Sequence, residues 1–174
     1  YRPSHPGALA HLDPPPLTIS VIGDLVSASL NNNLLAEELS PITSKLEREL
    51  CKWLAKKIGM PNKAGGVAAS GGTLSNLMAL VVARKHFGLE CSNDLIIFAS
   101  EDSHVSLIKA LIVMGLPKDS LRLVPIDKEG RMCMQSLKNM VKESKLQGRK
   151  CFAIVGTAGT TVRGAIDPIS DLSD

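Results

Sequence analysis

Residues 67–76 read Val-Ala-Ala-Ser-Gly-Gly-Thr-Leu-Ser-Asn: a short apolar run meets two glycines, and a helical pattern follows. Apolar residues then recur at helical spacing, so we expect Thr73 to be the N-cap of a helix that ends near Phe87. A strand, a glycine turn and a helix start in this order favour an anion-binding site, because the first amides of a helix are unpaired. We call residues 70–73 the glycine turn.

Taken alone, the glycine turn supports two interpretations about equally. Gly71 and Gly72 leave room for a phosphate, which the hydroxyl of Thr73 and the helix dipole would stabilise. The same residues also fit an ordinary turn that Thr73 caps. The spacing has neither the lysine of the nucleotide P-loop nor the three spaced glycines of the dinucleotide fingerprint, so we expect neither of those sites.

Downstream of the glycine turn, three short apolar runs alternate with helical patterns. We expect strands at residues 95–99, 121–125 and 151–155, and helices at 105–115 and 134–145. This alternation predicts an α/β fold, with a mainly parallel sheet and helices on both of its faces. Ligands of such sheets bind at the carboxyl ends of the strands, and His104 and Thr157 each follow a predicted strand.

The N-terminal part of the chain has a different character. Residues 1–16 are rich in proline and end in three consecutive prolines, which predicts an extended arm. Amphipathic helices are expected at 19–30 and at 41–58, the second with Pro41 in its first turn. We therefore divide the chain into an N-terminal arm with helices, residues 1–60, and the first part of a larger α/β domain, residues 61–174.

The composition argues against several functional classes. Aromatic residues make up 3% of the chain and the formal net charge is +3 with no basic stripe, so we expect neither nucleic acid nor an anionic membrane as a partner. No apolar run approaches the ~20 residues that cross a bilayer. The four cysteines lie far apart without metal-ligand spacing, which indicates reduced thiols in a cytoplasmic protein and no metal site.

Four segments of the chain, taken together, match the pattern of one protein family. They are the proline-rich leader from His5 to Pro16, residues 70–76, His104 with Ser106 and Lys109, and the segment Gly-Thr-Ala-Gly-Thr-Thr at 156–161 with Gly-Ala-Ile-Asp-Pro at 164–168. Together they resemble the pyridoxal-phosphate-dependent group II amino-acid decarboxylases, a family that includes glutamate, aromatic amino acid, cysteine sulfinate and 2,4-diaminobutyrate decarboxylases. The likeness covers nearly the whole chain.

The resemblance implies a fold-type-I large domain with pyridoxal phosphate as the cofactor. Gly72 and Thr73 would bind the phosphate of the cofactor. His104 would lie flat against the pyridine ring and act as a catalytic residue in proton transfer, and Thr157 would contact the ring substituents. Without the resemblance, a histidine at the start of a helix is more often a surface or capping residue.

The resemblance also implies a substrate and a partner. His11 and Pro14 of the leader would line the substrate pocket, in a homodimer whose subunits are intertwined. The implied reaction is the decarboxylation of an L-amino acid. Which amino acid the enzyme takes does not follow from the sequence.

Two motifs of the family do not occur in the chain. They are the His-Lys pair, whose lysine binds the cofactor covalently, and the Asp-Ala-Ala run that pairs with the ring nitrogen. We therefore expect the chain to correspond to about the first half of such an enzyme and to be inactive alone. The alternatives are another fold-type-I enzyme, or an inactive relative that acts as a dimerisation or regulatory subunit.

For two further residues the sequence predicts a structural role or position only. Asp167 precedes Pro168 and is expected to be the N-cap of a following helix. Lys109 lies on the helix after His104, and we expect it to face solvent. We assign neither residue a function.

Overall fold

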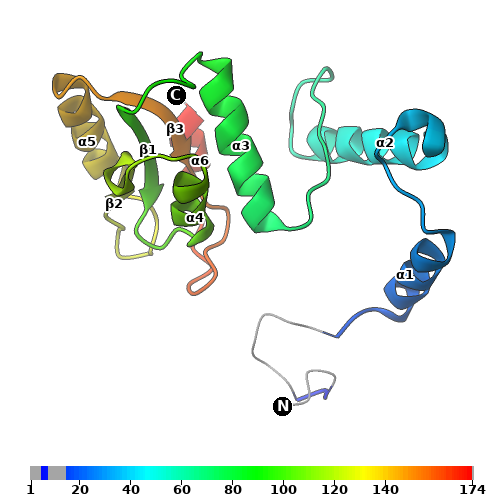
Figure 1. Cartoon of the computed structure of the whole chain (residues 1–174). Coiled ribbons are helices and arrows are strands. Elements are labelled where there is room, and N and C mark those ends of the chain that lie inside the picture. Colours follow the sequence, from blue (N-terminus) through cyan, green and yellow to red (C-terminus); the bar gives the residue numbers. More distant parts are fainter. Residues whose placement is uncertain (1–4, 8–14, 174) are drawn as a thin grey trace. The chain divides into compact units, whose positions relative to one another are not determined.

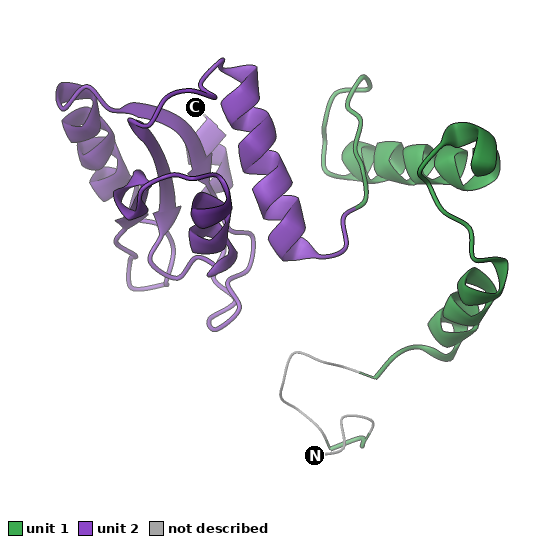
Figure 2. Ribbon diagram, viewed as in Figure 1, with its two compact units in different colours: residues 1–68 green, residues 69–174 purple. Residues whose placement is uncertain are grey.

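The computed structural model describes residues 5–7 and 15–173. The chain divides into two compact units, Tyr1–Ala68 and Ala69–Asp174, each of which is described by itself (Figure 2). His11 and Pro14 lie outside the described residues, so their place in a substrate pocket stays a prediction.

The first unit contains the helix α1 (Thr18–Leu30), a short 3-10 helix η1 (Glu37–Leu39) and the helix α2 (Pro41–Lys57). Asn31 ends α1 in the left-handed conformation, with φ 44°. Ser40 is the N-cap of α2 and Pro41 its first residue, as the sequence predicts. No residue of α1 is buried, and α2 buries only Ser44 and Ala55, so the apolar faces of both helices are largely exposed.

The second unit contains a parallel sheet of three strands in the order β2-β1-β3 (Figure 1). Its elements are α3 (Gly72–His86), β1 (Leu95–Ser100), α4 (Ser106–Val113), the 3-10 helix η2 (Lys118–Ser120), β2 (Leu121–Val124), α5 (Met134–Leu146), β3 (Lys150–Val155) and α6 (Ile169–Ser173). The predicted strands and the helices between them are therefore present, and β1 is the central strand.

Two apolar clusters lie on opposite faces of the sheet. Every residue of β1 is buried, and its side chains alternate between the two clusters. Leu95, Ile97 and Ala99 belong to the cluster that includes residues of α3 and α4. Ile96 and Phe98 belong to the cluster that includes Leu137 of α5. Helices therefore cover both faces of the sheet, as the alternating pattern predicts.

The structure corrects two expectations at the glycine turn. Residues 67–69 form no strand. Gly71, not Thr73, is the N-cap of α3, and Thr73 is the second residue of the helix. The reason is backbone geometry: Gly71 is extended, with φ 167° and ψ 170°, and the helix begins at the next residue. The amide of Ser75 donates to the carbonyl of Gly71 over 3.1 Å and closes the first turn.

The described part of the chain lacks two features. No helix there is both long enough and apolar enough to cross a membrane. No group of three or more potential metal ligands occurs there either.

Candidate functional site

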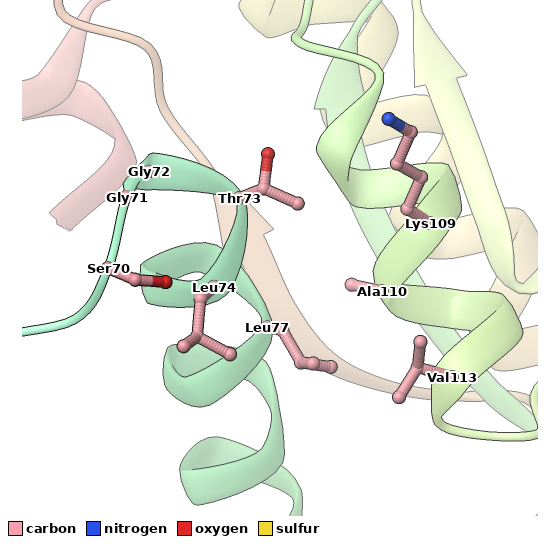
Figure 3. Close-up of a pocket in the computed structure, with 9 residues that line it drawn as sticks. All are labelled: Ser70, Gly71, Gly72, Thr73, Leu74, Leu77, Lys109, Ala110 and Val113. Carbon is pink, nitrogen blue, oxygen red and sulfur yellow. The ribbon is translucent and has the colours of Figure 1, made fainter.

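A pocket of about 460 Å³ lies between the start of α3 and the side of α4. It is lined by the glycine turn, by Leu74 and Leu77 of α3, and by Lys109, Ala110 and Val113 of α4 (Figure 3). This volume is within the range of small-molecule sites, which measure ~300–1,000 Å³. Of the predicted cofactor-binding residues, the pocket contains Gly72 and Thr73.

The glycine turn has the features that a phosphate needs. A Cβ atom added to Gly71 or Gly72 would meet no atom within 4 Å, so the backbone is open to a ligand. The amides of Gly72, Thr73 and Leu74 precede the first hydrogen bond of α3, which Ser75 makes. Backbone amides at a helix start, a neighbouring hydroxyl and the positive end of the dipole favour a dianion. The residues present therefore fit the phosphate group of pyridoxal phosphate.

Lys109 also belongs to this pocket, which the sequence interpretation missed. Its side chain is exposed, as expected, but it lines the pocket from α4, across from Thr73 of α3 (Figure 3). Its ammonium group adds a positive charge to a site that otherwise offers neutral donors. The sequence did carry a signal for this position of Lys109. Lys109 follows Ser106 by three residues, which places both near one face of α4, and the structure buries Ser106.

His104 is connected to the start of α3 by two hydrogen bonds. Its Nδ1 accepts the backbone N–H of Ser106 over 3.2 Å. The hydroxyl of Ser106 accepts a hydrogen bond of 2.8 Å from the side-chain amide of Asn76, the fifth residue of α3. Because Nδ1 is the acceptor, the neutral imidazole carries its proton on Nε2. His104 itself is exposed and does not line the 460 Å³ pocket.

Thr157 follows β3 and is held by Asp167. The amide of Thr157 donates to Oδ2 of Asp167 over 2.8 Å, and the carbonyl of Thr157 accepts the amide of Asp167 over 2.9 Å. Oδ1 of the same carboxylate accepts the amide of Met132 over 2.7 Å. Asp167 is thus a buried carboxylate that joins loops. Its expected role as an N-cap is wrong, because α6 begins at Ile169 and the carboxylate bonds elsewhere.

An ion pair connects the loops that carry His104 and Thr157. Nε of Arg163, in the loop after β3, donates to Oδ2 of Asp102, two residues before His104, over 2.7 Å. Figure 1 shows this loop and the start of α3 at the end of the sheet toward which the strands point. Gly72, Thr73, His104 and Thr157 therefore occupy one end of the second unit. That end is the usual ligand-binding end of a parallel sheet.

The fold and the site define a parallel α/β domain with a helix start suited to an anion at the carboxyl ends of its strands. The comparisons with known proteins specify the class. A family model described as "Pyridoxal-dependent decarboxylase conserved domain" matches residues 4–174. The chain belongs to this family, whose cofactor is pyridoxal phosphate, and the resemblance inferred from the sequence is confirmed.

Individual relatives agree with the family. The aromatic-L-amino-acid decarboxylase of Bacillus atrophaeus is 31% identical over 98% of this chain and 35% of its own length. The L-2,4-diaminobutyrate decarboxylase of Rhizobium meliloti strain 1021 is 31% identical over 98% of this chain and 34% of its own length. The chain thus spans about a third of the length of these curated relatives.

A solved structure shows the same fold. The glutamate decarboxylase domain of diaminobutyrate-pyruvate transaminase and L-2,4-diaminobutyrate decarboxylase from Vibrio parahaemolyticus matches with a TM-score of 0.85 at 32% identity. The match covers 91% of this chain and 38% of that chain.

Proposed function

We propose that the protein containing this chain decarboxylates an L-amino acid with pyridoxal phosphate. The observation that carries the proposal is the hydrogen-bonded path from Asn76 through Ser106 to His104. It connects α3, whose first residues are proposed to bind the phosphate, to the imidazole expected at the cofactor ring. The names of the relatives support the reaction type, because those described above are amino-acid decarboxylases.

The glycine turn is proposed to bind the cofactor phosphate. The amides of Gly72 and Thr73 and the hydroxyl of Thr73 would donate to its oxygens, and the ammonium of Lys109 would neutralise part of its charge. The chemistry that pyridoxal phosphate supplies when bound is an electron sink for the bonding pair left on the substrate when carbon dioxide departs. Thr157 is proposed to contact the ring substituents.

His104 is proposed as the catalytic residue of this chain. A planar imidazole suits a position against an aromatic ring. Its Nδ1 accepts the Ser106 amide, so Nε2–H is the group left to donate to a substrate. This atom would donate to the substrate carboxylate or return a proton to the reacting carbon, which are roles of a general acid.

The test measures cofactor binding and carbon dioxide release in the whole protein. Pyridoxal phosphate is titrated by its visible absorbance, and acidic, basic, aromatic and sulfinate L-amino acids are assayed for carbon dioxide. We expect binding and release from one class. We expect Thr73→Val to weaken binding by about tenfold, the effect of losing a hydrogen bond to a charged group, while Thr18→Val at the exposed start of α1 leaves it unchanged.

Two results would contradict the proposal. A protein that binds no pyridoxal phosphate would refute the site. A protein that binds it but yields a keto acid without carbon dioxide would be a different fold-type-I enzyme, which is one of the two alternatives that the sequence leaves open.

We further propose that the protein is a homodimer. Support comes from the apolar faces of α1 and α2, where Leu25 is 66% and Trp53 55% exposed. Surfaces of this kind are usually covered by another chain or domain. Light scattering should give a dimer mass for the parent and a smaller mass for Leu25→Lys. Ser27→Lys, on the opposite side of α1, is the matched control and should stay dimeric. A parent that is monomeric would refute the proposal.

A cytoplasmic location is proposed on the state of the cysteines. All four are free: Cys51, Cys91, Cys133 and Cys151. Unpaired thiols are typical of a reducing compartment. Fractionation of cells that express the tagged protein should recover it with cytoplasmic markers, and recovery from an oxidising compartment would refute the proposal.

A further inference from the structure

One buried carboxylate connects the segments that follow the two outer strands of the sheet. Met132 lies in the loop after β2, and Thr157 lies two residues after the end of β3. The central strand β1 separates β2 from β3, so these loops do not pair with each other through the sheet. Asp167 accepts one amide from each, at 2.7 and 2.8 Å.

The geometry requires two acceptors at this position. Asp167 is 2% exposed, and each of its oxygens accepts a different main-chain N–H. An asparagine of the same shape has one oxygen and one NH₂ group. Its NH₂ group would face either the Met132 or the Thr157 amide as donor against donor, and one of the two bonds would be lost. An ionised carboxylate satisfies both bonds, and its hydrogen bonds are the stronger kind.

Thr157 is held on both sides of its backbone. Its amide donates to the Asp167 carboxylate and its carbonyl accepts the Asp167 amide. Farther along the same loop, the hydroxyl of Thr160 accepts the amide of Ala165 over 3.1 Å and closes the hairpin. The backbone direction at Thr157, and with it the starting direction of its side chain, is therefore set by Asp167 rather than by the neighbouring strand.

We propose that Asp167 is a positioning residue of the cofactor site, which fixes Thr157 in the orientation that contacts pyridoxal phosphate. The inference rests on the proposed function, in which Thr157 touches the cofactor. Asp167 itself reaches neither cofactor nor substrate. It acts through the main chain of Thr157, while its bond to Met132 holds the carboxylate in place.

A double-mutant cycle on the whole protein tests the proposal. The four proteins are the parent, Asp167→Asn, Thr157→Val and the double variant, and the readout is the dissociation constant of pyridoxal phosphate. We expect each single variant to weaken binding about tenfold, as the loss of one hydrogen bond to a charged group does. We expect Asp167→Asn to add less than about twofold once the hydroxyl of Thr157 is gone, because residues that act through one contact are not additive.

The controls separate positioning from simple destabilisation. Asp171→Asn makes the same chemical change four residues later, on an exposed residue of α6, and should leave binding unchanged. Hydrogen exchange should show faster exchange of the Thr157 or the Met132 amide in Asp167→Asn. If that variant does not fold, Asp167→Glu takes its place in the cycle, because it keeps two acceptor oxygens but displaces them by one methylene.

The outcomes are distinct. If Asp167→Asn weakens cofactor binding equally with and without the Thr157 hydroxyl, the proposal is overturned, and Asp167 has only a general structural role. Unchanged binding in Asp167→Asn would overturn it as well. A parent that does not bind pyridoxal phosphate would instead refute the proposed function, and the inference with it. Slower or unchanged exchange at both the Thr157 and the Met132 amide would show that Asp167 does not hold Thr157.

Discussion

The side-chain amide of Asn76 donates a hydrogen bond of 2.8 Å to the hydroxyl of Ser106 across 30 residues of sequence. The two partners are buried to different extents: Ser106 is fully buried, whereas Asn76 is half-buried. The bond joins the helix that begins at the glycine turn to the helix that follows His104. Its removal should therefore affect both the stability of the second unit and the site.

The burial of the two partners predicts unequal mutational effects. Asn76→Ala leaves the buried hydroxyl of Ser106 without its donor, which costs roughly 1–3 kcal/mol of unfolding free energy. Ser106→Ala removes that hydroxyl and leaves an amide that water reaches, so its cost should be smaller. Urea unfolding of the single and double variants measures both effects. Equal costs, or a larger cost for Ser106→Ala, would contradict the geometry.

Two glycine substitutions should differ in their effect on cofactor binding. A Cβ at Gly72 meets nothing within 4 Å, and alanine is the better helix former, so Gly72→Ala should fold at least as stably as the parent. The same Cβ would occupy space proposed for the phosphate, so the variant should bind pyridoxal phosphate more than about tenfold weaker. A Cβ at Gly156 would lie 2.7 Å from Cδ1 of Ile169 and 2.9 Å from Cδ1 of Leu172. Both atoms are the far ends of flexible side chains that can shift, so Gly156→Ala should cost no more than about 1 kcal/mol of stability and leave cofactor binding unchanged.

Thermal unfolding and cofactor titration of both glycine variants separate the two cases. If Gly72→Ala binds the cofactor like the parent, the phosphate does not approach the glycine turn.

His104→Phe separates the two proposed roles of His104. Phenylalanine keeps a flat ring but has no proton to donate, so we expect cofactor binding to change by less than about threefold and carbon dioxide release to fall by roughly 10²–10⁴. His86→Phe, at the exposed end of α3, is the matched control and should change neither quantity. Loss of binding together with release would indicate that His104 acts only in holding the cofactor.

Two cysteines should differ in their reactivity with pH. Hydrogen bonds from Ser136 lower the pKa of the Cys133 thiol below its usual 9.0, whereas burial raises the pKa of Cys151 above that value. At pH 8 the thiolate fraction, and hence the rate of alkylation by iodoacetamide, should be larger for Cys133. Mass spectrometry of labelled peptides over a pH series measures both midpoints. Ser136→Ala should move the Cys133 midpoint upward, and no movement would exclude this cause.

The strands and helices of the second unit could be predicted because their signals are local. The run Leu95-Ile96-Ile97-Phe98-Ala99 is apolar on both faces, and this is the strand that the structure buries completely. The strand order β2-β1-β3 was not predicted, because sequence order does not determine which parallel strand is central. The sequence did contain one signal for the central strand: β1 is continuously apolar, as a strand buried on both faces is, whereas β3 begins with Lys150.

The contacts of the site were harder to predict because they join distant residues. The carboxylate of Asp167 bonds an amide 35 residues earlier, and no pattern near Asp167 and Pro168 reveals that partner. The N-cap at the glycine turn was misplaced for a different reason: threonine and glycine have similar capping preferences, so residue type does not distinguish Thr73 from Gly71. The extended backbone angles fall at Gly71, and they decide where the helix begins.

The central position of β1 has a consequence for synthesis of the protein. Both of its neighbours, β2 and β3, come later in the chain, so β1 leaves the ribosome before either can pair with it. Its apolar side chains and free backbone groups stay accessible until the emerging chain has passed β3. We therefore expect the newly made second unit to be prone to aggregation at this stage, and slowing translation between β1 and β3 should increase that aggregation.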